Sequence, residues 1–272
     1  MDAHAPYLPP APYNRMFPGA DPSFTKSKYS SLARNVLTLN RRVSEAERRH
    51  LISQYDGAIA YMDSQLGALF RTLREVRRFD NSIVIVTSDH GEAFGRRNCL
   101  YHGGMSAYQN QIGVPLLIKY PNRRSAEVVH LPVSGVDVFS TVLDTLSFDI
   151  PKQAQGQSLL RLRPGESRTI VSESFGECGA YFGNPARFHR SYRAFYTGEL
   201  KYILSSDGER ELYDLSADPA ETHNLFISGD PVSRRLEQVA AGWARPSALI
   251  KPKARMPNRE TVERLKSLGY VQ

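Results

Sequence analysis

The sequence contains only two cysteines, Cys99 and Cys178, in 272 residues. Two cysteines this far apart form neither a disulfide framework nor a multi-cysteine zinc site, so we interpret both as ordinary thiols. Long apolar runs are absent too, because no stretch approaches the roughly 20 residues needed to span a bilayer. The first residues, MDAHAPYLPP, lack the basic start and apolar centre of a signal peptide. These absences exclude a disulfide-rich scaffold and predict no membrane segment in the chain.

Acidic residues are in the minority, with 28 Asp and Glu against 35 Lys and Arg and a formal net charge of +7. The basic residues are spread over a probable helix and several loops, and no nucleic-acid-binding motif accompanies them. We therefore expect no nucleic-acid partner, and an anionic small molecule fits the charge better. The apolar content of 41% is enough for a sizeable core, either in one large α/β domain or in a domain with a smaller partner.

The first part of the chain predicts helices that alternate with buried strands. The first forty residues are rich in Pro, Tyr, Ser and Asn and are interpreted as irregular. Ser44 begins a capping box, and apolar residues at spacings of three and four predict a helix over 44–78. The apolar runs 82–87 and 114–119 predict central parallel strands, because helices cover both faces of such sheets. Residues 136–146 are predicted to form a further helix.

We expect a catalytic part over residues 1–165 and a C-terminal subdomain over 166–272. Residues 169–172 predict a further short strand. From about residue 187 the pattern changes, and short runs separated by turn residues such as Thr197-Gly198 predict a small antiparallel sheet. Its expected strands are 190–196, 200–205 and 210–213, and the expected helices are 232–243 and 259–268.

Two polar side chains, Asp89 and His90, follow directly on the predicted strand 82–87. Ligands of open α/β sheets gather at the carboxyl ends of strands. A carboxylate and a neutral imidazole together suit a divalent cation, and Gly91 allows a tight turn after them. The alternative is an aspartate that caps a helix beside a surface histidine. The pattern alone favours neither.

Other histidines are less distinctive. His4 stands beside prolines and His102 beside two glycines, which is typical of surface loops. His102 nevertheless follows Asp89 by thirteen residues, in the loop before the next strand, and could reach the same pocket as a general acid or anion ligand. We predict that Glu92 favours a following helical turn rather than assisting the pocket. The remaining histidines are interpreted as structural or surface residues: His50, His130, His189 and His223.

Six stretches, taken in order, resemble the sulfatase family of the alkaline phosphatase superfamily. They are MDAHAPYLPP, YDGAIAYMDSQLGALFRTL, NSIVIVTSDHGEAFG, YQNQIGVPLLIKYP, VSGVDVFSTVLDTL with GQSLL, and ELYDLSADPAETHNL with the terminal LKSLGYV. The correspondence covers nearly the whole chain. It implies an alkaline-phosphatase-like α/β sandwich, partial because an N-terminal part is missing, and a small C-terminal α+β subdomain with an antiparallel sheet.

The resemblance implies hydrolysis of sulfate esters or, in related branches, of phosphate or phosphonate esters, with a divalent metal ion. By position it implies Asp89 and His90 as metal ligands, and His4 and His102 as catalytic residues beside the anionic ester. Calcium is the expected ion, with manganese, magnesium and zinc as alternatives. Gly104 falls where the family often has a basic side chain, which leaves the role of His102 less secure.

The chain departs from the family in lacking a nucleophile. Family members carry a Cys/Ser-x-Pro-x-Arg motif and an early pair of acidic metal ligands, and no cysteine or serine here is followed by that pattern. We therefore expect this chain to be the C-terminal portion of a longer catalytic unit and to be inactive alone. Its expected partner is either a missing N-terminal region or a second copy in a homo-oligomer. Two alternatives stay open. One is a phosphoryl or phosphoethanolamine transferase of the same superfamily, and the other is a truncated binding or assembly module.

Overall fold

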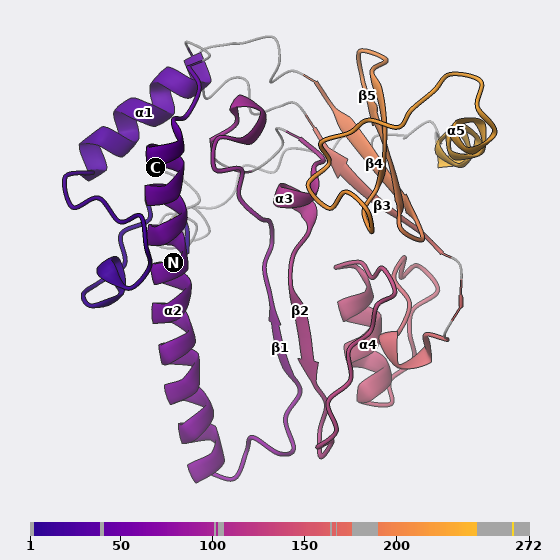
Figure 1. Cartoon of the computed structure of the whole chain (residues 1–272). Helices are drawn as coiled ribbons and strands as arrows, with labels where there is room; N and C mark the ends of the chain where they lie inside the picture. Colours follow the sequence, from indigo (N-terminus) through magenta and orange to yellow (C-terminus); the bar gives the residue numbers. More distant parts are fainter. Residues whose placement is uncertain are drawn as a thin grey trace.

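The computed structural model describes residues 3–38, 41–100, 102, 106–163, 165–166, 168–175, 190–243 and 263. Figure 1 shows a long helix on one side, a two-stranded ribbon in the middle, and a separate four-stranded sheet with its own helix on the other side. The alkaline-phosphatase-like α/β fold expected from the sequence is confirmed. Three short 3-10 helices lie in the connections, at Tyr13–Arg15, Arg96–Asn98 and Leu159–Arg161.

Helix α2, Glu45–Glu75, begins with the predicted capping box. The Ser44 hydroxyl accepts a hydrogen bond from the Glu47 amide at 3.3 Å, and the Glu47 carboxylate accepts one from the Ser44 amide at 2.9 Å. The apolar stripe is buried only in its first half. Leu51 is 1% exposed, whereas Leu69 is 51% exposed. Beyond Ala58, helix α2 buries none of its residues within the described part of the chain.

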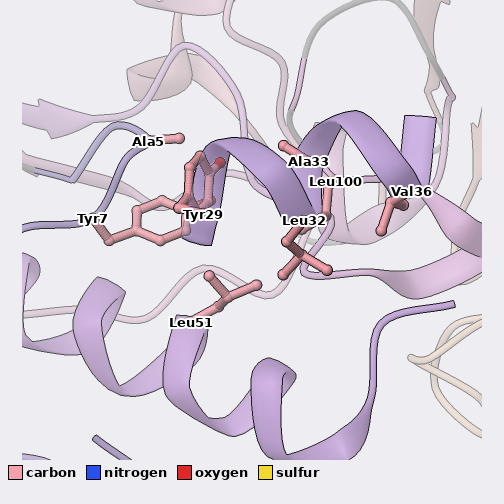
Figure 2. Packing of buried hydrophobic residues seen from close by; sticks show 8 residues of the cluster. All are labelled: Ala5, Tyr7, Tyr29, Leu32, Ala33, Val36, Leu51 and Leu100. Carbon is pink, nitrogen blue, oxygen red and sulfur yellow. The ribbon is translucent and has the colours of Figure 1, made fainter. Parts of the chain in front are cut away.

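Helix α1, Lys26–Thr38, contradicts the prediction that the first forty residues are irregular. Its buried residues recur at helical spacing and are Tyr29, Leu32, Ala33, Val36 and Leu37. All of them except Leu37 pack with Ala5, Tyr7, Leu51 and Leu100 in one apolar cluster, drawn in Figure 2. The prediction weighed the prolines and polar residues of the whole segment, although the apolar residues of 29–37 alone have helical spacing.

Strands β1, Val84–Thr87, and β2, Leu116–Lys119, pair with each other in antiparallel register, from Val84 opposite Lys119 to Thr87 opposite Leu116. The prediction of parallel strands was wrong. A parallel pair needs a crossover connection, usually a helix. The described residues between β1 and β2 form only the 3-10 helix Arg96–Asn98 and the four-residue helix α3, Gln109–Ile112. None of the eight side chains in this ribbon is buried.

Four further strands form an antiparallel sheet in the order β3-β4-β5-β6. The turn pattern predicts the last three, and β3 joins them by pairing with β4. They are β3 (Thr169–Ser174), β4 (Tyr192–Thr197), β5 (Leu200–Ser205) and β6 (Arg210–Asp214). Helix α4, Asp137–Thr145, precedes them, and α5, Pro231–Trp243, follows. The helix predicted at 259–268 lies outside the described residues, apart from position 263. The boundary at 165/166 stays a prediction.

The four-stranded sheet packs on both faces. One face contributes Phe195, Tyr202 and Leu212 to a cluster with Leu236 and Ala240 of α5. Buried residues of the other face pack against the segment that leads into α3, and this cluster contains Ala107, Ala194, Ile203 and Tyr213. The sheet therefore supports the connection between β1 and β2. No helix in the described part of the chain has the length and apolar character to cross a membrane.

Candidate functional site

The loop after β1 places Asp89 and His90 where the sequence predicts them, at the end of the strand. The Ser88 hydroxyl donates to the His90 carbonyl at 2.6 Å, and the His90 amide donates to the Asp89 carboxylate at 3.1 Å. The Asp89 side chain is 63% exposed and the His90 side chain 33% exposed, with His90 Nε2 at 3.7 Å from Asp89 Oδ2. The two donor groups therefore lie side by side at an accessible edge.

Three histidines from separate segments meet at this edge. The rings of His90 and His102 stack with their centroids 4.0 Å apart and an interplanar angle of 12°. His4 packs edge-on against His102, with centroids 4.6 Å apart. The structure thus brings together all four predicted site residues, because Asp89 contacts His90. The three rings form one cluster, in which His4 is exposed and His90 and His102 are partly exposed.

Each of the three rings has a hydrogen-bond partner at Nδ1. His4 Nδ1 lies 2.7 Å from the Ala5 carbonyl oxygen, and His90 Nδ1 lies 2.9 Å from the Gly91 carbonyl oxygen. A carbonyl oxygen only accepts, so Nδ1 carries the proton in both rings. A neutral imidazole of this tautomer has its lone pair on Nε2, the atom that binds a metal or accepts a proton.

Glu92 is a residue of the site that was not predicted from the sequence. No helical turn follows it directly, so the predicted role was wrong, and its side chain is only 4% exposed. Glu92 Oε2 lies 3.0 Å from His102 Nδ1, and Oε1 accepts the Ala93 amide at 3.0 Å. Burial alone would raise the pKa of Glu92, but His102, Tyr7 and the Ala93 amide lower it below its usual value. A buried carboxylate therefore orients the His102 ring.

No spacing along the chain signals this role, because the ring that Glu92 contacts lies ten residues further on. The turn at Gly91 is fixed by contacts with the segment before β2. The Gly91 amide donates to the Gln111 carbonyl at 2.7 Å, and the Glu92 amide donates to the Asn110 carbonyl at 2.8 Å. A Cβ at Gly91 would lie 2.3 Å from the Asn110 carbonyl oxygen, so this close approach requires glycine.

Of the other histidines, His50, His130 and His223 lie in the described part of the chain. His50 is buried, packs on Phe24 and accepts the Asp21 amide at 2.9 Å. Burial lowers its pKa, although Asp21 opposes the shift. His130 and His223 are exposed, and His189 lies outside the described residues. Cys99 is a buried thiol, and Cys178 lies outside the described part of the chain.

The donor set fits a divalent cation only in part. Asp89 offers carboxylate oxygens and His90 an oriented imidazole nitrogen, both suitable ligands. In the described residues, no three or more His, Cys, Asp or Glu side chains form a group that could hold a metal ion. A complete coordination shell needs ligands beyond these two.

Comparison with known proteins agrees with the motif order. The sulfatase family profile matches residues 1–148, and the profile of the N-sulphoglucosamine sulphohydrolase C-terminal region matches residues 101–239. Arylsulfatase K of Mus musculus is 31% identical over 222 residues, which are 77% of this chain and 38% of the relative. The multifunctional alkaline phosphatase superfamily protein PehA of Trinickia caryophylli is 26% identical over 88% of this chain and 53% of its own length.

A solved structure shows the same fold. The phosphonate monoester hydrolase of Silicibacter pomeroyi superimposes with a TM-score of 0.66 and 21% identity, covering 89% of this chain and 53% of that one. The chain thus spans about two-fifths to one-half of the length of these relatives. The family profile covers more than half of the chain, and the matched segment contains the whole histidine cluster. This chain belongs to the sulfatase family.

Proposed function

We propose that this chain supplies the histidine-rich part of the active site of a metal-dependent sulfatase-like hydrolase. The observation that supports this most directly is the meeting of His4, His90 and His102 beside Asp89 at the end of β1. The substrate class is an anionic sulfate, phosphate or phosphonate ester. Arylsulfatase K and the phosphonate monoester hydrolase, both similar to this chain, support that class.

In this proposal Asp89 and His90 are ligands of a divalent cation, with calcium preferred over manganese, magnesium or zinc. When bound, such a cation neutralises negative charge on the ester oxygens. His90 is held for ligation by the hydrogen bond from its Nδ1 to the Gly91 carbonyl. The carboxylate of Asp89 is accessible from solvent on the same side.

His4 and His102 bind the ester group and move protons. With Nδ1–H of His102 bound to Glu92, its Nε2 either accepts a proton or, once protonated, donates one to an ester oxygen. His4 packs against His102, so an anion that contacts one imidazole lies within reach of the other.

The chain alone does not turn over an ester, because its sequence lacks the Cys/Ser-x-Pro-x-Arg nucleophile motif. We expect purified protein to show no metal-dependent hydrolysis of p-nitrophenyl sulfate, p-nitrophenyl phosphate or an aryl phosphonate ester above a His90→Ala control. Turnover well above that control would show that the chain contains a complete site.

Metal binding tests the ligand assignment directly. Calorimetric titration with calcium chloride, and separately with manganese chloride, should show binding that Asp89→Asn and His90→Ala abolish. The matched control is His223→Ala, whose side chain is 84% exposed and away from the cluster. Equal binding by all variants, or no binding by the unmodified chain, would contradict the assignment of these two ligands.

A second candidate is a non-catalytic binding or assembly module. The favouring observation is the β1–β2 ribbon, in which no side chain is buried and Leu117 is 60% exposed. Light scattering after size exclusion, with and without calcium, measures whether the chain is a homo-oligomer. A folded monomer over a wide concentration range would argue against the assembly role.

A further inference from the structure

The segments on both sides of His102 are attached to the four-stranded sheet. The segment before it contains Arg97, and the segment after it contains Tyr108 and Gln109. Contacts of both reach residues more than 85 positions later in the chain. His102 itself contacts Glu92 and the rings of His90 and His4. The two flanking segments determine where the loop that carries it leaves and rejoins the sheet.

The first attachment is made by Arg97. Its guanidinium donates to the Tyr213 hydroxyl at 3.0 Å and to the Glu221 carbonyl at 2.6 Å. The same group lies 3.7 Å from the centre of the Tyr108 ring, so it also connects the two flanking segments. Arg97 has a positive φ of 51°, a conformation that an arginine keeps only where its surroundings hold it.

The second attachment is made by Tyr108 and Gln109. The Tyr108 hydroxyl donates to Glu211 of β6 at 2.6 Å. The Gln109 amide donates to the Glu221 carboxylate at 2.6 Å, and the Gln109 side chain accepts from the Tyr196 hydroxyl at 2.8 Å. Helix α3 begins here, and its residues 110 and 111 accept the amides of Glu92 and Gly91. The sheet is thus connected, through α3, to the loop that carries His90.

Beneath both attachments lies a buried ion pair. Lys201 Nζ of β5 donates to Glu221 Oε1 at 2.5 Å, and the two side chains are 0% and 3% exposed. The other oxygen of Glu221 holds the Gln109 amide. One carboxylate therefore joins the sheet core, through Lys201, to the first residue of α3.

We propose that Glu221 and Arg97 are positioning residues, which hold His102 stacked on His90 by attaching both flanking segments to the β4–β6 sheet. The inference rests on the proposed function, since the positioned ring belongs to the proposed site. It assigns the C-terminal sheet a role within that site, although none of its residues touches the histidine cluster.

The test compares Glu221→Gln with Glu209→Gln in the full chain. Glu209 is a matched control, because it belongs to an exposed ion pair with Arg190 at another turn of the same sheet. Hydrogen exchange is followed at the amides of Gly91 and Glu92, which pair with α3, and at amides between β4 and β5. Losing a charged hydrogen-bond partner corresponds to roughly ten- to hundredfold faster exchange.

We expect a larger acceleration at Gly91 and Glu92 than between β4 and β5 in Glu221→Gln, and none at either place in Glu209→Gln. The imidazole proton resonances of His90 and His102 should shift in the same variant, because stacked rings shield each other. Should Glu221→Gln fail to fold, Arg97→Lys replaces it, since lysine keeps a positive charge beside Glu211 but removes the guanidinium that donates to Tyr213 and to the Glu221 carbonyl.

Equal acceleration at every amide would show a purely structural role and overturn the proposal. Unchanged exchange and unchanged histidine resonances would overturn it as well. Neither measurement uses metal or ester. Failure of the proposed metal site would therefore appear in the calorimetric titrations, while failure of the positioning role would appear only here.

Discussion

Replacing Lys201 by methionine tests how the buried pair with Glu221 contributes to stability. Methionine retains most of the side-chain volume but removes the ammonium group that faces Glu221 at 2.5 Å. Glu221 is 3% exposed and would become a buried carboxylate without its cation. Breaking one partner of a buried pair costs about 3–5 kcal/mol. The free energy of unfolding, measured by urea denaturation at pH 7, should fall by this amount.

The double variant Lys201→Met/Glu221→Gln separates pairing from packing. Glutamine is neutral, so no buried charge remains at this pair. We expect the double variant to be more stable than Lys201→Met alone, since replacing a buried ion pair by neutral groups is often nearly neutral. A loss below about 1 kcal/mol in Lys201→Met, or a double variant less stable than the single one, would refute the reasoning.

Three further predictions concern other parts of the molecule. Burial lowers the pKa of Lys201 to about 8, although the charge of Glu221 opposes this shift. Lys201 therefore binds a proton more tightly in the unfolded chain than in the folded chain. The stability of the unmodified chain relative to Lys201→Met should therefore rise as the pH increases from about 8 to about 10, measured by urea denaturation. Gly91→Ala should cost about 1–3 kcal/mol, because its Cβ would meet the Asn110 carbonyl at 2.3 Å, and wild-type stability would contradict that approach. Leu51→Ala should cost about 2–5 kcal/mol in thermal unfolding, because Leu51 is 1% exposed. Leu117→Ala should change stability by at most about 0.5 kcal/mol, because Leu117 is 60% exposed. Similar losses in the two variants would contradict this difference in exposure.

Local patterns predicted the elements whose signals lie within a few residues. The capping box at Ser44 and the helix after it were predicted because the hydrogen bonds of a cap join neighbours in the chain. The C-terminal strands were predicted because each turn pairs adjacent runs. The direction of the partner of β1 was not readable, since an apolar run has the same pattern in either kind of sheet.

The role of Glu92 shows why a site is harder to predict than a strand. In the sequence its carboxylate favoured a following helical turn as plausibly as the pocket. The structure removes it from solvent and sets it 3.0 Å from His102, which no spacing rule along the chain specifies. Likewise, the link from Glu221 to Gln109 joins residues 112 positions apart.

The sequence by itself determined the sulfatase resemblance, the long capped helix, the acid–imidazole pair at the end of a strand and the absence of the nucleophile motif. Each of these is encoded in residue types and short spacings, which physical chemistry relates directly to caps, strands and ligands. Only the tertiary structure decided that β1 and β2 run antiparallel, that His4 and His102 meet His90, and that the distant sheet holds the segments around them. Those features arise from burial and pairing between remote segments, which form only when the whole chain packs.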